Sequence, residues 1–477
     1  MRRLVTLALL AVTALPAVAD ESPVLGIGPF GVSVRPDGRE VYVPLFGQFS
    51  PTFVTGTTAA VLDGATGNVL ATIPTGVQPE DVAFTPEGRH AFITNSGSAT
   101  VTIVDTRTRT VVSTVEVGKP DAPYLYGIQI GTVLGSRTVT VRTFGRTIQF
   151  VVPAVRTLAY VNSTGGNADG SEENVFVLEA DARDRNFGKI VDTIELSGGF
   201  TRGDLRRTSY VSARGFPGND FSASPEVAIF RTRDNSLRST ITVHPAPGGV
   251  HGLEDLALDP AGRFAYVAAF DWVGGSDEVY VVDVASGKVS DIVRLGTSDV
   301  AQHGIAVSPD GLLVAVTNFN AGTVSWIFTP THTVVRETTT GAGPNEVAFR
   351  SDGRRAFVTN QLGGTVSWFD LETSDRLVVR LVREAIAAGN ASAQATRRLQ
   401  TRIAVLSKAL DRGPDRAARV QLAHLVDEVR RFASAGELTV VRAKDLVPPS
   451  AATNQLATPL DQGGAETFDP TAATLSR

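Results

Sequence analysis

VAFTPEGRHAFITN (Val82–Asn95) is repeated with small changes at four other places in the chain. The other copies are VSVRPDGREVYVPL (Val32–Leu45), LALDPAGRFAYVAA (Leu256–Ala269), IAVSPDGLLVAVTN (Ile305–Asn318) and VAFRSDGRRAFVTN (Val347–Asn360). Each copy has a short apolar run, a turn of the Pro-Asp-Gly kind and a second, alternating run. Proline presets φ at the first turn position and glycine accepts the left-handed conformation, so each copy predicts a β-hairpin.

Two further strands follow the hairpin in each repeat. Thr100–Asp105 (TVTIVD) and Thr365–Asp370 (TVSWFD) occupy the place of a third strand, and Thr110–Val117 that of a fourth. Units of four antiparallel strands are the blades of a β-propeller. The sequence therefore predicts an all-β fold for this part of the chain.

The spacing of the turn glycines predicts seven blades. Gly38 and Gly88 are 50 residues apart, whereas 174 residues separate Gly88 from Gly262, which leaves room for three long intervals or four short ones. Weak second strands near Tyr160–Asn162 and Tyr210–Ser212 favour three intervals, and eight blades is the alternative. The polar stretch Ser163–Glu173 predicts a protruding loop.

The repeats resemble the YVTN family of β-propellers on the residues AFITN, AVTN and AFVTN. The resemblance covers roughly residues 24–373 and implies a propeller over residues 20–373. It is much less specific for function, because related propellers include electron-transfer partners, surface-layer proteins, lactonases and binding scaffolds.

The N-terminus predicts export. Arg2 and Arg3 precede the apolar run Leu4–Leu15, and small residues stand at Ala17 and Ala19. This arrangement is typical of a secretory signal peptide, here residues 1–19 with cleavage before Asp20. The run is too short for a membrane anchor, so we expect a periplasmic or secreted protein with no integral membrane segment in the mature chain.

Composition excludes several classes of function. The chain has no cysteine, which rules out disulfides, thiolate metal sites, iron–sulfur clusters and cysteine nucleophiles. Its formal net charge of -5 argues against a nucleic-acid partner, which normally requires a basic surface.

The period changes after Thr373, and residues 374–449 predict a small helical bundle. Apolar residues recur at helical spacing from Leu399 to Leu410 and from Ala418 to Phe432, and a preceding helix is expected over Asp375–Ala388. This region holds 12 Arg and 2 Lys against 8 acidic residues, so it is basic. A short last helix is expected near Thr439, and residues 450–477 predict a disordered tail.

This region resembles the FIMAH type of helical domain found in exported bacterial proteins. The matching stretches are LVREAIAAG (Leu381–Gly389), LSKALDRG (Leu406–Gly413), AHLVDEVRRF (Ala423–Phe432) and GELTVVRAKDL (Gly436–Leu446). The residues that name the family are replaced here by Ala423–Asp427. The resemblance implies an accessory module.

Aligning the repeats by their turn glycines places several polar side chains in one column, just before the first strand of each blade. In a propeller this column surrounds one mouth of the central channel. The candidate ligand-binding residues there are Glu80, Asp81, Glu254, Asp255, His303, Asn345 and Glu346. Trp272, in the loop Asp271–Asp277, is a further candidate contact for a partner or ligand.

Two hypotheses of function follow from this column. The first is an exported, non-catalytic binding scaffold that recognises a partner protein or small ligand at the channel mouth, since no known catalytic motif occurs in the chain. The alternative is a lactonase-like or metal-assisted hydrolase. There Glu80, Glu254, His303 and Glu346 would hold a divalent cation that activates water, with no other cofactor expected.

Overall fold

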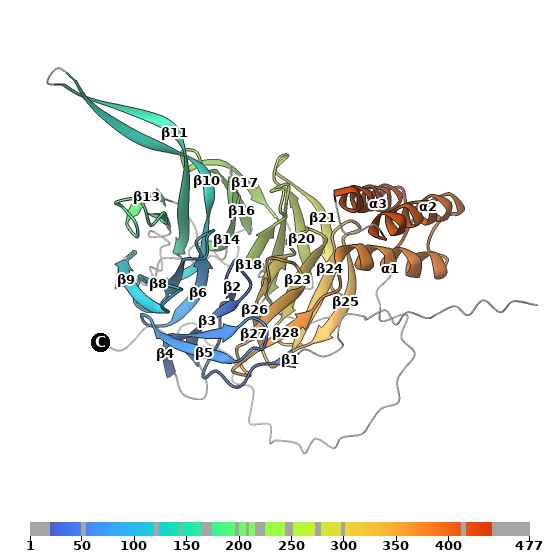
Figure 1. The fold of residues 1–477 in the computed structure, drawn as a ribbon, viewed down its shortest axis with the longest axis horizontal. Helices are drawn as coiled ribbons and strands as arrows, with labels where there is room; N and C mark the ends of the chain where they lie inside the picture. Colours follow the sequence, from blue (N-terminus) through green and yellow to red (C-terminus); the bar gives the residue numbers. More distant parts are fainter. Residues whose placement is uncertain are drawn as a thin grey trace, which may run out of the picture. The chain divides into compact units, whose positions relative to one another are not determined.

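The structure, a computed structural model, contains a seven-bladed β-propeller followed by three helices (Figure 1). It describes residues 20–48, 54–118, 124–143, 146–163, 174–195, 200–206, 209–214, 225–243, 251–271, 278–296, 301–411 and 416–440. All of these lie in one compact unit, Met1–Arg442, and the second unit, Ala443–Arg477, lies outside the described residues. The predicted signal peptide and tail also lie outside them.

Each blade is a four-stranded antiparallel sheet, as the repeats predict. Blades 1 and 2 contain β2 (Ser33–Val34), β3 (Glu40–Gln48), β4 (Val54–Asp63), β5 (Val69–Pro74), β6 (Pro79–Phe84), β7 (His90–Asn95), β8 (Thr100–Asp105) and β9 (Thr110–Glu116). Blades 3 and 4 contain β10 (Leu125–Thr143), β11 (Arg146–Ser163), β12 (Asn174–Glu179), β13 (Ile190–Glu195), β14 (Phe200–Arg206), β15 (Ser209–Arg214), β16 (Glu226–Arg231) and β17 (Ser236–Thr242).

The remaining blades complete the ring. Blades 5 and 6 contain β18 (His251–Leu258), β19 (Phe264–Asp271), β20 (Glu278–Asp283), β21 (Lys288–Arg294), β22 (Gln302–Val307), β23 (Leu313–Asn318), β24 (Thr323–Phe328) and β25 (Thr333–Thr339). Blade 7 contains β26 (Pro344–Phe349), β27 (Arg355–Asn360), β28 (Thr365–Asp370) and, from the other end of the chain, β1 (Asp20–Glu21).

The propeller is closed by β1, which the repeats do not predict. Asp20 and Glu21 pair with Trp368 and Ser367 of β28, so the first described residues supply the outermost strand of the last blade. The next residue continues the contact, because the Ser22 N–H donates to the Val366 carbonyl and the Val366 N–H donates to Ser22 Oγ. The ring is thus fastened by hydrogen bonds between its two ends.

The hairpin turns agree with the prediction from glycine. In the five clear repeats the turn glycine has φ between 67° and 73°, in the left-handed region, and its N–H donates to a carbonyl three residues earlier. We call the end of the propeller that carries these turns the turn face, and the opposite end, where the innermost strands begin, the mouth. The core lies between neighbouring blades, where Trp326 is fully buried and Trp368 nearly so.

Blade 3 departs from the repeat. In place of a tight turn its first two strands continue outward as a long ribbon, with residues paired from Leu125↔Ser163 to Thr143↔Arg146 (Figure 1). The next strand, β12, pairs with β11 only from Leu158 to Ser163. We call the part beyond the blade, Thr132–Thr157, the arm. The loop expected at Ser163–Glu173 lies outside the described residues except for Ser163.

The helices α1 (Ser374–Ala387), α2 (Ala393–Leu410) and α3 (Arg416–Ser434) follow β28. They share a hydrophobic core with the propeller, because Leu377 and Leu381 of α1 belong to the same buried cluster as Trp326 and Phe328. Arg380 adds an ion pair to the buried carboxylate of Glu372, with Nε 2.9 Å from Oε1. The helix expected near Thr439 falls largely outside the described residues. Over the described part of the chain, no helix has the length and apolar character needed to cross a bilayer.

The closing strand can be tested by shortening the N-terminus. A chain beginning at Pro23 lacks the pairing of β1 and the bonds of Ser22, so we expect its free energy of unfolding to fall by about 2–3 kcal/mol, since each lost hydrogen bond contributes about 1 kcal/mol. The control begins at Asp20 and retains these bonds. Urea unfolding measures both, and equal stability of the two chains would show that β1 does not fasten the ring.

Candidate functional site

The predicted column of polar residues lies at the mouth, in a bulge that recurs in the innermost strands. The pairing of β6 with β7 skips from Pro79 to Val82, so Glu80 and Asp81 form an irregular step. Equivalent steps interrupt β18, β22 and β26, and they contain the other candidates from Glu254 to Glu346. Trp272 lies outside the described residues.

Two aspartates of this column connect neighbouring blades. Asp81 Oδ1 accepts from its neighbour Val82 N at 2.7 Å, and Oδ2 accepts from Ile128 N of blade 3 at 2.9 Å. Asp255 repeats this arrangement with Leu256 N at 2.8 Å and Ile305 N of blade 6 at 3.1 Å. Both carboxylates are buried. They therefore join innermost strands around the ring, a role that the sequence analysis did not foresee.

The threonine before each motif asparagine makes a similar bridge. In blade 6, Thr317 Oγ1 accepts from Gly304 N in its own bulge at 2.8 Å and donates to Asn345 O of blade 7 at 2.7 Å. Thr94 and Thr359 make the same two contacts in their blades. The repeated hydroxyl thus binds one bulge to the next.

The motif asparagines hold the third strand. Asn318 Nδ2 donates to Thr323 Oγ1 and Ser325 Oγ, both at 2.9 Å. Asn95 and Asn360 donate in the same way to the corresponding residues of their blades. Among the candidates, Asn345 is also buried, and its Nδ2 donates to Gln361 Oε1 at 3.0 Å. These side-chain amides therefore stabilise the blades through hydrogen bonds within each blade.

One pair of candidates, Glu254 and His303, is close together and partly accessible to solvent. His303 Nδ1 lies 4.0 Å from Glu254 Oε1, across the boundary between blades 5 and 6, and the two side chains are 20% and 24% exposed. Such a carboxylate–imidazole pair could serve in general acid–base chemistry. By contrast Glu80 is only 2% exposed.

The cation site of the hydrolase hypothesis is not formed by these side chains. Among the residues that the structure describes, no three or more His, Asp or Glu side chains are grouped so that they could hold a metal ion. Asp81, Asp255 and Glu346 line a channel cavity of about 330 Å³, which all seven innermost strands border. The side chains Glu80, Glu254, His303 and Glu346 do not meet in one group.

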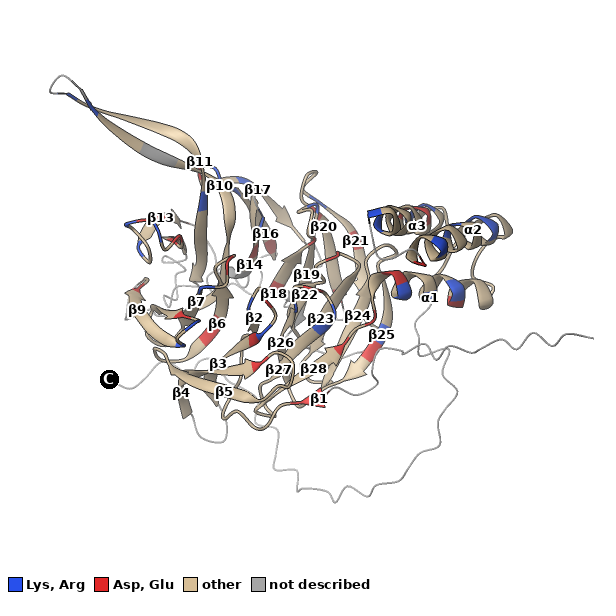
Figure 2. Cartoon of the chain, viewed as in Figure 1, with Lys and Arg blue, Asp and Glu red and all other residues tan. Residues whose placement is uncertain are grey.

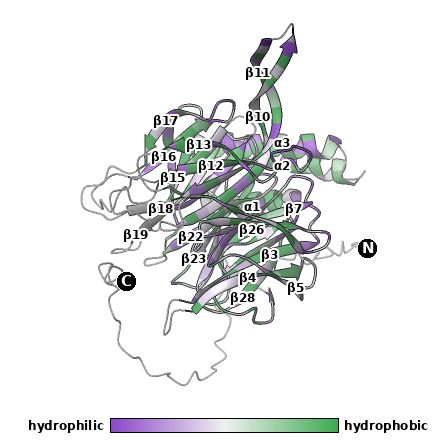
Figure 3. Ribbon diagram, turned by 90° about the vertical axis from the view of Figure 1, so that its left-hand side faces the viewer, coloured by the Kyte–Doolittle hydropathy of each residue, from purple (hydrophilic) through white to green (hydrophobic). Residues whose placement is uncertain are grey.

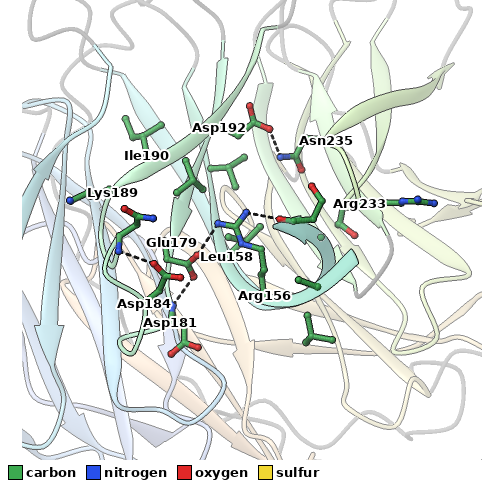
Figure 4. A pocket seen from close by; sticks show the side chains of 18 of the residues that line it. Arg156, Leu158, Glu179, Asp181, Asp184, Lys189, Ile190, Asp192, Arg233 and Asn235 are labelled. Atoms are coloured by element: carbon green, nitrogen blue, oxygen red, sulfur yellow. Dashed lines mark hydrogen bonds and ion pairs between the residues drawn. The ribbon is translucent and has the colours of Figure 1, made fainter. Parts of the chain in front are cut away.

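A much larger cavity lies at the base of the arm, where sequence reasoning placed no site (Figure 4). Its volume is about 1430 Å³, and its walls are the arm, the turn between β12 and β13, and the turn between β16 and β17. We call it the groove. Its lining includes the acidic residues Glu179, Asp181, Asp184, Asp192 and Asp234 and the basic residues Arg156, Arg183, Arg185, Lys189 and Arg233.

The groove has fixed walls. Arg156 Nη2 donates to the buried Glu179 Oε2 at 2.8 Å, which ties the arm to its own blade. Thr232 Oγ1 of blade 4 donates to the Leu134 carbonyl at 3.2 Å, which ties the arm to the next blade. A cavity bordered by such contacts is preorganised for a ligand.

A hydrogen-bonded chain forms the floor between blades 3 and 4. Asn235 Nδ2 donates to Asp192 Oδ2 at 2.7 Å (Figure 4). Beneath them, Tyr160 Oη donates to Asn235 Oδ1 at 2.8 Å. Burial, and then the charge of Asp192, raises the pKa of Tyr160, so the phenol stays protonated and donates. The floor of the groove is therefore polar.

The bridging role of the threonines predicts a specific loss of stability. Thr317→Val is close in shape but leaves Gly304 N and Asn345 O without their partner, so we expect the free energy of unfolding to fall by about 2–3 kcal/mol. Thr317→Ser keeps the hydroxyl and loses one methyl group, which costs about 1 kcal/mol. Urea denaturation of the three proteins measures the difference, and equal losses in both variants would contradict the bridge.

Comparison with known proteins identifies the fold and no family. No protein-family profile matches the chain, and no curated protein does. The YVTN and FIMAH resemblances are therefore not confirmed. Among solved structures, the chain is similar to Kuenenia stuttgartiensis hydrazine synthase, with a TM-score of 0.56 and 18% sequence identity over 72% of this chain and 96% of that chain. This likeness shows that the chain has a β-propeller fold in common with that protein.

Proposed function

We propose that this protein is a non-catalytic binding scaffold that recognises a polypeptide partner in the groove. The observation that carries the proposal is a cavity of about 1430 Å³ with five acidic and five basic side chains in fixed walls. Small-molecule sites usually have volumes of about 300–1,000 Å³ and mostly apolar walls. A large polar groove with both signs of charge instead suits an extended segment of protein.

The mouth supports this choice by its own chemistry. Asp81 and Asp255 use both carboxylate oxygens on backbone amides, and Asn345 uses its amide on Gln361. A ligand at the mouth would have to compete with these bonds. Recognition of a ligand there, the original form of the scaffold hypothesis, therefore has less support than recognition in the groove.

The second candidate function is a hydrolase whose chemistry would come from side chains instead of a bound cation. It rests on His303 and Glu254, which face one another at 4.0 Å and are partly accessible. An imidazole oriented by a carboxylate could activate water on an ester or lactone. Export of the protein, predicted from residues 1–19, is compatible with either function and is part of the proposal.

Charge reversal in the groove tests the scaffold. Lys189→Glu combined with Arg233→Glu changes two exposed side chains of its lining, so a partner captured from the native host should bind at least about tenfold more weakly. The matched control is Arg397→Glu with Arg416→Glu, two exposed residues of the helices. Cross-linking mass spectrometry should place the partner on the groove walls in the wild type.

Two outcomes contradict the scaffold. One is a partner whose affinity is unchanged by the groove substitutions. The other is turnover of a lactone or ester that His303→Ala abolishes, which would establish the second candidate.

A further inference from the structure

The arm extends far beyond the blades. Its pairs run from Thr132↔Thr157 to Thr143↔Arg146, and at about 3.3 Å per residue it is roughly 35 Å long. Neither edge of this ribbon pairs with another described strand. A two-stranded ribbon with no packing partner is only marginally stable in water. We therefore expect the outer arm, residues 139–152, to gain stability from contact with another surface.

The outer arm has one apolar face. Val139 lies opposite Phe150 and Val141 lies opposite Ile148, and Val152 follows Phe150 on the same face because side chains alternate along a strand. These five side chains are between 36% and 49% exposed. By the same alternation Arg146 shares the face of Val141 and Ile148, at its outer end. The other face of the same stretch carries Thr140, Arg142, Thr147, Gln149 and the exposed Val151. Green and purple therefore alternate along the arm in Figure 3.

The arm is also basic throughout. The hairpin Leu125–Ser163 contains Arg137, Arg142, Arg146 and Arg156 and no acidic residue, although the whole chain has a net charge of -5 (Figure 2). Among the arginines of this hairpin whose side chains the structure describes, Arg156 at the base forms an ion pair with Glu179, and none is found for Arg142 or Arg146. The last described pair of the arm, Thr143 and Arg146, lies several Debye lengths from its base, since this length is about 8 Å at physiological ionic strength. The negative charge of the body is therefore screened at the end of the arm, which presents a cationic, amphipathic ribbon to solvent.

These properties favour an anionic lipid surface over a second copy of the chain. Two arms packed on their apolar faces would bring like charges together, which is destabilising. The groove at the base offers equal numbers of acidic and basic residues, so it provides no net attraction for the arm of a second copy. An anionic bilayer surface offers a negative potential for the arginines and an apolar layer for the valines, isoleucine and phenylalanine.

Backbone chemistry determines the depth of insertion. The free edges of the ribbon present N–H and C=O groups, which cannot be left unpaired in hydrocarbon. The arm therefore cannot span the membrane as a single hairpin and must lie in the headgroup region. We propose that the outer arm is a membrane-surface anchor that lies on anionic lipid with Val141, Ile148, Phe150 and Val152 toward the acyl chains.

Vesicle co-sedimentation tests the anchor on the full chain. Vesicles of phosphatidylcholine with one third phosphatidylglycerol should bind the protein at 0.1 M salt, whereas pure phosphatidylcholine should not. Val141→Thr with Ile148→Thr and Phe150→Thr, three residues outside the groove lining, should lower the partition coefficient about tenfold or more, and so, separately, should Arg142→Gln with Arg146→Gln. In Phe150→Trp the indole emission should shift to the blue when vesicles are added.

Matched controls separate the arm from the rest of the molecule. Val111→Thr with Val112→Thr changes exposed valines of β9, and Arg397→Gln with Arg416→Gln removes charge from the helices; both should bind vesicles like the wild type. The groove variant Lys189→Glu with Arg233→Glu should retain most vesicle binding, so failure of the anchor and failure of the scaffold are distinguishable.

Three results would overturn the anchor. The first is no binding to anionic vesicles by the wild type. The second is binding that the arm variants retain, which would assign it to the helices. The third is a concentration-dependent dimer, seen by light scattering, that the apolar-face variant loses, which would make a second copy the occupant of the arm.

Discussion

The ring of blades depends on hydrogen bonds that cross between the innermost strands of neighbouring blades. Asp81 and Asp255 each accept one N–H from their own strand and one from the neighbouring blade. Asp204 makes the same kind of connection from β14 to Leu258 of β18. The bridging threonines add a second set of contacts at the bulges. Because Asp81, Asp255 and the threonines are buried, their bonds are shielded from competing water and hold the blades in register.

The need to hold the ring together gives the mouth and the turn face of the propeller different residues. The mouth is built from repeated residues whose polar atoms stabilise the ring. Among its candidate residues that the structure describes, Glu254 and His303 face one another and are partly exposed. The turn face carries the segments that break the repeat: the arm, the groove and the helices, which begin where Ser374 Oγ donates to Asp310 in the turn before β23. Specific recognition is expected where a repeat protein departs from its repeat, because identical positions perform the shared structural task.

The sequence predicted the blades well because their signals are local. A turn glycine with positive φ and an alternating strand on each side are visible within fourteen residues, and the spacing of the glycines indicated seven blades. The closing strand β1 escaped prediction because two residues have no period and their partner is more than three hundred residues away. The threonine and aspartate bridges also required the fold, since they join residues of different blades.

The sequence of the arm contains a pattern that predicts its amphipathic character. Val139, Val141, Ile148 and Phe150 alternate with the polar residues Thr140, Arg142, Thr147 and Gln149, in a stretch that contains no acidic residue. Such alternation is typical of an amphipathic ribbon. The repeat does not predict it, because blade 3 lacks the Pro-Asp-Gly turn. The groove could not be predicted from the sequence, since its walls are the arm and two turns that belong to two different blades.

The most direct test of the account is hydrogen–deuterium exchange in two aspartate variants. Asp81→Ala should speed exchange in the segment 125–130, where the Ile128 amide loses its acceptor, and leave the segment 302–307 unchanged. Asp255→Ala should do the reverse, through Ile305. Exchange in both segments at the wild-type rate in both variants would contradict the claim that these carboxylates join the blades, and would return them to the list of candidate ligand-binding residues.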